Sequence, residues 1–228
     1  NVTLRVMGGK GGKKRHSARP KVVRCFPEED GAMDGTGGRA SDGSGATTYV
    51  ALLRGVNVGG HRPIKMPELK RLFETMGFGQ VRTYIQSGNV IFTSADEPLE
   101  LLRQRIEREI AARFGFPVTV VPRTAAELER VIADCPFAAD ALAEGESLYV
   151  ALLADAPSPD GVERLRACDC GSDEARIAGR EVYLLYRRSA RDTPLTNAFL
   201  ERTLGVAATT RNWRTMQTLV GMASATEA

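Results

Sequence analysis

The sequence contains no apolar run approaching the ~20 residues that a membrane-spanning helix needs, so no transmembrane helix and no membrane partner are predicted. The basic residues near the amino terminus are not followed by an apolar stretch, which excludes the usual pattern of a secretory signal. Cysteine is scarce, with four in 228 residues, and a small secreted domain held by disulfides would have a denser set. We therefore expect a cytoplasmic protein in a reducing compartment.

The sequence also lacks a convincing metal-binding pattern. Cys168 and Cys170 form the one close pair of cysteines, whereas Cys25 and Cys135 are isolated. A structural zinc site takes four ligands, and neither a second pair nor a nearby histidine supplies the other two. We expect no metal and no cofactor, and a structural or incidental role for the pair.

Charge is distributed unevenly along the chain. The net charge is +3, but residues 1–46 hold nine basic and five acidic residues, and the remainder holds 22 basic and 23 acidic residues. A nearly neutral body exerts no overall attraction on a polyanion. Nucleic acid is therefore not expected as a partner of the folded body.

Residues 1–46 differ from the rest in composition. They contain ten of the 23 glycines, few large apolar residues and no periodic pattern, so they cannot bury enough surface to offset chain entropy. The glycines near Lys13 lack the spacing and the preceding strand of a phosphate-binding loop. We expect a disordered, Gly-rich basic tail over 1–46, with a nucleic-acid-binding arm as the alternative to a nonfunctional extension. Residues 224–228 are expected to be a flexible C-terminus.

Order is expected from Thr47 onward, in an alternation of strands and helices. The segment Thr48–Leu53 is apolar on both faces, as in a central strand. A polar loop and a helix with apolar residues at helical spacing follow, then two strands joined at Ser87 and Gly88, a second helix, and a fourth strand. The predicted ranges are 66–76 and 98–114 for the helices, and 81–86, 89–93 and 118–121 for the strands. The order β-α-β-β-α-β is that of ferredoxin-like domains.

The second half of the chain repeats this order. A linking helix begins at Thr124, where Glu127 completes a capping box. LYVALL (148–153) echoes TYVALL (48–53), and Asn212 precedes a final helix. The predicted ranges between them are a helix from 158, strands at 174–177 and 182–186, a helix at 195–204 and a strand at 207–211. We predict an α+β fold of two tandem ferredoxin-like subdomains, 47–122 and 123–223, with a linking helix and a C-terminal helix.

Two motifs of the first half indicate a family. YVALLRGVNVGG (49–60) resembles the opening of an uncharacterised, mainly bacterial family, the domain of unknown function 1697 family, and TYIQSGNV (83–90) resembles its second signature. Later landmarks are similar at 123–124, 136–137, 195–196 and 211–213, so the resemblance covers about 47–223. It implies two ferredoxin-like subdomains and no established activity.

The predicted topology brings two polar loops together. With strand order 4-1-3-2, the first two strands run in the same direction, so the loop after the first strand and the hairpin after the second meet at one edge of the sheet. Glycines there allow close approach, the following helix start favours anions, and a guanidinium can bind them in bidentate fashion. We predict a site for a small anionic or polar ligand at Arg54, Asn57, Gly59, Gly60, His61, Lys65, Gln86, Ser87 and Asn89.

Three alternatives stay open for this edge. In the first it is only scaffold, because Asn57, Asn89 and Gln86 can tie turns together through their own side chains. In the second the protein is an enzyme acting on a phosphorylated or nucleotide-like substrate, with His61 as the near-neutral acid–base group and Ser87 needing a base within reach. In the third the protein is a nucleic-acid-binding module that acts through the basic tail and the sheet, or a protein interaction module.

The uncovered faces of the predicted sheets motivate the third alternative. Such a face needs a partner, either the other subdomain or a second copy in a homodimer. Stacking of nucleic-acid bases is disfavoured, because Tyr84, Phe92 and their neighbour Val90 are better explained as packing residues in a body with no basic excess.

Overall fold

The computed structural model describes residues 45–187, 189–190 and 192–225. The predicted tail therefore lies outside the described residues except for its last two positions, and so does most of the predicted flexible C-terminus. In the described part of the chain no helix is both long and apolar enough to cross a membrane.

The first half of the fold contains four strands and two helices in the predicted order, and a third helix follows it directly. These elements are β1 (Ala46–Leu53), α1 (Met66–Thr75), β2 (Gly79–Tyr84), β3 (Asn89–Ala95), α2 (Leu99–Phe114), β4 (Val120–Thr124) and α3 (Ala125–Ala133).

The second half repeats the order and ends in the C-terminal helix. Its elements are β5 (Ser147–Leu153), α4 (Pro159–Arg166), β6 (Glu174–Ala178), β7 (Glu181–Tyr186), α5 (Asn197–Leu204), β8 (Ala208–Asn212) and α6 (Trp213–Ser224). The predicted α+β class is confirmed.

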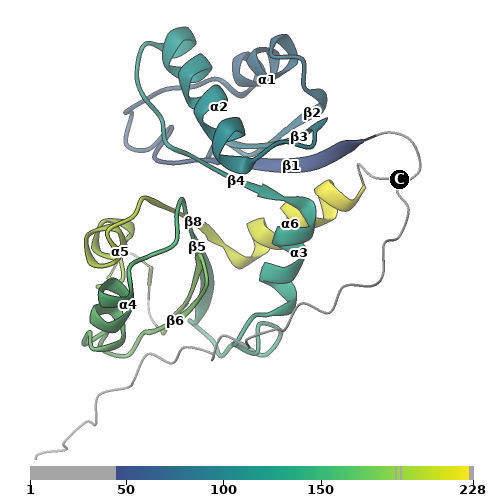
Figure 1. Cartoon of the computed structure of the whole chain (residues 1–228). Helices are drawn as coiled ribbons and strands as arrows, with labels where there is room; N and C mark the ends of the chain where they lie inside the picture. The colour runs from purple at the N-terminus through teal and green to yellow at the C-terminus, as the bar shows by residue number, and fades with distance from the viewer. Residues whose placement is uncertain (1–44, 188, 191, 226–228) are drawn as a thin grey trace, which may run out of the picture.

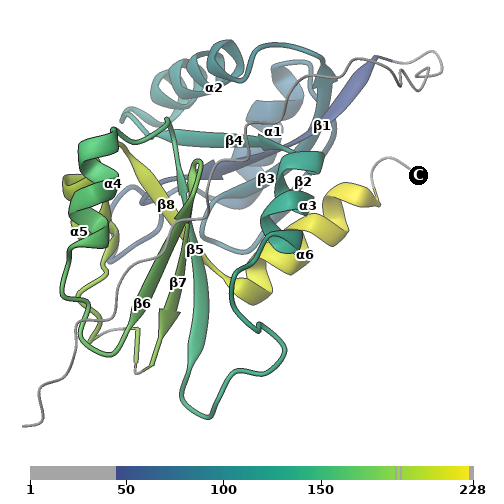
Figure 2. The same ribbon diagram turned by 60° about the horizontal axis from the view of Figure 1, so that its bottom comes forward.

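Each half forms one antiparallel sheet. The strand orders are β2-β3-β1-β4 and β6-β7-β5-β8, so the first strand of each half lies between its third and fourth strands. Helices α1 and α2 cover the outer face of the first sheet, and α4 and α5 cover that of the second (Figure 1). Helices α3 and α6 lie side by side next to the two inner faces (Figure 2).

The inner faces of the two sheets share one core. Alternate residues of β1 point to opposite sides, so Ala51 packs in the outer core of the first half whereas Val50 and Leu52 pack in the shared core. Val150 and Leu152 of β5 enter the shared core from the other sheet. The two halves therefore cover each other's inner faces.

The aromatic residue at the centre of the first sheet is a core residue. Phe92 is fully buried, and its ring centroid lies 5.2 Å from that of Phe73 and 4.4 Å from that of Phe78. This position confirms the packing role predicted for it.

Capping side chains fix the start of α3 and α6, the helices that follow the fourth strand of each half. Thr124 Oγ1 accepts a hydrogen bond from the Glu127 amide at 3.1 Å, and the Glu127 carboxylate accepts one from the Thr124 amide at 2.8 Å, which confirms the predicted capping box. Asn212 caps α6 by accepting from the Thr215 amide at 2.8 Å. Each strand therefore passes into its helix without a loop.

Some predicted boundaries differ from the structure. The turn between β2 and β3 spans residues 85–88 rather than two residues, because Ile85 and Gly88 both have left-handed backbones, with φ of 49° and 75°. Strand β4 begins at Val120 rather than at Val118.

Cys168 and Cys170, assigned a structural or incidental role from the sequence, form a disulfide.

Candidate functional site

A pocket of about 540 Å³ lies where the two halves meet beyond the end of β1. We call it the interface pocket. Its walls come from the end of β1 and the loop after it, the β2–β3 turn, the start of α5, and β8: Leu53, Arg54, Gly55, Val56, Val58, His61, Arg62, Ser87, Asn197, Ala208, Thr209, Thr210 and Arg211. This volume is within the range of about 300–1,000 Å³ that is typical of small-molecule sites.

Asn57 joins the two loops whose convergence the topology predicted. Its side-chain amide donates to the carbonyls of Ile64 at 2.9 Å and Gln86 at 2.8 Å, and its oxygen accepts from the Ile64 amide at 2.8 Å. Its φ of 56° is in the left-handed region that Asn tolerates. The loop after β1 is thereby closed and fastened to the β2–β3 turn, and Asn57 supports the pocket without lining it.

Asn89 supports the pocket without lining it. It is fully buried, and its side-chain nitrogen donates to the Tyr84 carbonyl at 2.9 Å and to Ser87 Oγ at 3.0 Å. Its side-chain oxygen accepts a hydrogen bond from Arg211 Nε at 2.7 Å. Asn89 therefore connects the β2–β3 turn of the first half to β8 of the second.

Arg211 is a buried cation in the wall of the pocket. Besides Asn89, its guanidinium donates to Thr209 Oγ1 at 2.7 Å and to the carbonyls of Thr210 at 3.0 Å, Leu53 at 2.9 Å and Ser87 at 3.0 Å. All five of its N–H groups are thus used. Burial lowers the pKa of Arg211 to about 10, which still leaves it protonated at neutral pH.

The acceptors around Arg211 are all neutral. Among the residues described, no carboxylate lies within 4.0 Å of it. A buried charge is costly unless it is paired or well solvated by dipoles. The carbonyls, the amide and the hydroxyl solvate this charge but do not cancel it.

The predicted site residue Arg54 meets a carboxylate instead. It forms a two-pronged ion pair with Glu201 of α5, with Nη2 and Oε2 2.5 Å apart. Burial raises the pKa of Glu201, but the hydrogen bonds from Arg54 and from the Ala208 amide outweigh burial and leave this pKa lowered. Arg54 therefore connects the two halves at the rim of the pocket.

Arg62 and His61 also line the interface pocket. Arg62 is half-buried with a left-handed φ of 50°, and within the described ranges no acidic group lies within 4.0 Å of its guanidinium. Glu107 shares a smaller neighbouring pocket of about 180 Å³ with Arg62, and it accepts a hydrogen bond from the Val120 amide at 2.8 Å. Among the described residues that line the interface pocket, none has an acidic side chain.

The predicted site residues thus fall into three groups. Arg54, His61 and Ser87 line the interface pocket, and Asn57 and Asn89 hold its walls together. The remaining four do not line it: Gly59, Gly60, Lys65 and Gln86. Lys65 is exposed and pairs with Glu68 at 3.6 Å, and Gln86 contributes its backbone carbonyl to the bond with Asn57.

The sequence reasoning missed Arg62 and the whole second-half wall of the pocket, including Arg211. A signal for Arg211 was present in the sequence. Arg123 and Arg211 each stand directly before the N-cap residue of a helix, at the end of the fourth strand of their half. That repeat marks two equivalent positions, but it does not reveal that Arg211 lines a pocket.

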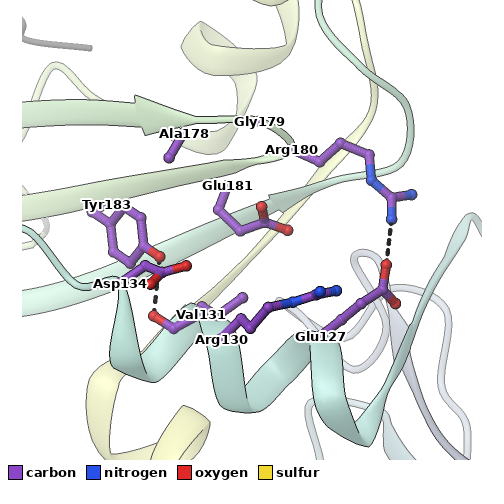
Figure 3. Close-up of a pocket in the computed structure, with 9 residues that line it drawn as sticks. All are labelled: Glu127, Arg130, Val131, Asp134, Ala178, Gly179, Arg180, Glu181 and Tyr183. Carbon is purple, nitrogen blue, oxygen red and sulfur yellow. Dashed lines mark hydrogen bonds and ion pairs between the residues drawn. The ribbon is translucent and has the colours of Figure 1, made fainter. Parts of the chain in front are cut away.

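A second pocket, of about 400 Å³, lies between α3 and the β6–β7 turn (Figure 3). Its charges are mixed: Glu127 and Arg180 form an ion pair at 2.8 Å, and Glu181 also lines the pocket. Tyr183 donates to the Val131 carbonyl at 3.0 Å, and burial raises its pKa. Opposite charges offset each other here, unlike in the interface pocket. Within the described ranges, no cluster of three or more His, Cys, Asp or Glu side chains could hold a metal ion.

Comparison with known proteins places the chain in a family. The family described as "Protein of unknown function (DUF1697)" matches residues 46–183, more than half of the chain. The structure of the conserved bacterial protein SP0830 from Streptococcus pneumoniae is similar, with a TM-score of 0.63 and 21% identity over 78% of this chain and 98% of that one, which shows a shared fold. No curated protein matches. The chain belongs to the DUF1697 family.

Proposed function

We propose that the interface pocket binds a small anionic ligand. The observation that carries the proposal is Arg211, a protonated guanidinium in the pocket wall that no described carboxylate neutralises. A positive charge surrounded by protein, with no counter-charge of its own, attracts an anion more strongly than an exposed one would, because water screens it less.

Arg211 acts through its charge, whereas other groups supply direct contacts. Its five N–H groups are already used, so a ligand would take hydrogen bonds from neighbours. Arg62 suits this role, since a guanidinium matches the geometry of phosphate and carboxylate oxygens. Ser87 Oγ accepts from Asn89, which leaves the hydroxyl proton to donate.

The remaining walls indicate what else the ligand contains. Apolar side chains also line the pocket: Leu53 and Val56 are buried, and Val58, which is 65% exposed, offers apolar surface near the arginines. An organic anion with a small apolar part would cover this surface, as in most small-molecule sites. The proposed ligand is thus a small metabolite carrying a phosphate or carboxylate group.

Calorimetry and thermal unfolding at constant ionic strength test the proposal, with inorganic phosphate, acetate and succinate compared with chloride. We expect at least one of the three to stabilise the wild-type protein beyond chloride, by about 2.7 kcal/mol at 100 times its dissociation constant. Arg62→Gln should weaken that binding at least tenfold, or about 1.4 kcal/mol. The control is Arg71→Gln, an exposed arginine on α1 outside the pocket lining.

Two results would overturn the proposal. One is that none of the three anions stabilises the wild-type protein more than chloride does. The other is that Arg62→Gln and Arg71→Gln bind the anion equally well, which would place any binding outside this pocket.

We also propose that the two halves are tandem ferredoxin-like subdomains, with boundaries at 47–122 and 123–223. The support is that both halves have the order β-α-β-β-α-β and the same strand arrangement.

A further inference from the structure

Two arginines occupy equivalent positions in the two halves. Arg123 on β4 is opposite Val50 of β1, and Arg211 on β8 is opposite Val150 of β5. Each guanidinium reaches into the other half of the protein and donates to the carbonyl of the last residue of that half's first strand. Arg123 donates to Leu153 of β5 at 2.8 Å, and Arg211 donates to Leu53 of β1 at 2.9 Å. The two arrangements therefore share one geometry.

The equivalence extends to the partner of each Nε atom. Arg123 Nε donates to the carboxylate of Glu181 at 3.1 Å, and Arg211 Nε donates to the amide oxygen of Asn89 at 2.7 Å. Glu181 is the first residue of β7, opposite Leu152 of β5, and Asn89 is the first residue of β3, opposite Leu52 of β1. The acceptor is a carboxylate in one half and a neutral amide in the other.

We infer that Asn89 is the residue that makes the interface pocket selective for anions. Glu181 of the second half cancels the charge of Arg123, which reaches it from the first half, whereas Asn89 of the first half holds Arg211 in the same geometry and leaves its charge uncancelled. The inference rests on the proposed function. A carboxylate at position 89 would neutralise Arg211 from inside and repel an incoming anion across the pocket wall.

Asn89→Asp tests the charge with little change of shape, because Asn and Asp have nearly the same size. With inorganic phosphate and succinate as probes, we expect Asn89→Asp to bind at least tenfold more weakly than the wild type. Asn89→Ser is the matched control: it stays neutral but loses hydrogen bonds to Tyr84 and Arg211. It should be less stable and bind the probe more weakly than the wild type, because the pocket wall loses support, but it should bind at least threefold more tightly than Asn89→Asp, since the charge of Arg211 is unaffected.

The possible outcomes separate this inference from the proposed function. If the wild type binds neither probe, the proposed function fails and the inference fails with it. If the wild type binds and Asn89→Asp binds equally well, the inference alone is wrong. A loss of affinity in Asn89→Ser as large as in Asn89→Asp would assign Asn89 a purely structural role and would likewise overturn the inference.

Discussion

Replacing Glu181 by Gln removes the counter-charge of Arg123 and little else. The Arg123 side chain is 1% exposed and that of Glu181 is 19% exposed, with nitrogen and oxygen 3.1 Å apart. Removing one partner of a fully buried ion pair costs about 3–5 kcal/mol. Gln still offers an oxygen to Nε, and the carbonyls of Pro122 and Leu153 still accept hydrogen bonds. We therefore expect the smaller cost of losing a charge-assisted hydrogen bond, about 2 kcal/mol.

Urea unfolding followed by circular dichroism measures this cost. The midpoint should fall with an unchanged m-value, and the melting temperature should drop by about 4–8 °C for a protein of this size. The control is Glu74→Gln, which breaks a half-exposed pair with Lys70 at 3.6 Å on α1 and should cost about 0.3–0.5 kcal/mol. Equal costs for the two substitutions would refute the reasoning, because burial of the Arg123 pair would then make no difference.

Three further predictions concern single positions. The pKa of Glu201 is lowered in the fold, so its ionised form stabilises the protein at neutral pH, and this contribution is lost as the pH falls below about 4.3 and through the lowered value. The stability difference between wild type and Glu201→Gln, measured by urea unfolding across pH, should shrink over that range; a constant difference would contradict the prediction. Thr124→Ala removes the cap of α3 and should cost about 1 kcal/mol in the same assay. Gly88→Ala should cost at least about 1 kcal/mol more than Gly115→Ala. Both glycines have left-handed φ, but only at Gly88 would the new Cβ meet other atoms, the nearest at 2.6 Å; equal costs would exclude that clash.

The sequence by itself determined the features that depend on neighbours along the chain. Apolar spacing located the strands and helices, and Thr124 and Gly115 marked helix ends where the structure has a capping box and a left-handed residue. The predicted neighbourhood of the two polar loops also followed, because strand order alone decides which loops share an edge. The bond from Asn57 to the Gln86 carbonyl confirms that neighbourhood.

Tertiary structure decided the charge of the site. The sequence assigned Arg54 to a ligand and gave Arg211 no role in the pocket, whereas in the fold Arg54 pairs with Glu201, 147 positions away, and Arg211 meets the neutral Asn89, 122 positions away. An arginine is available to an anion only if no carboxylate neutralises it. Which side chain lies beside it is set by the packing of one half against the other, and no local pattern encodes that packing.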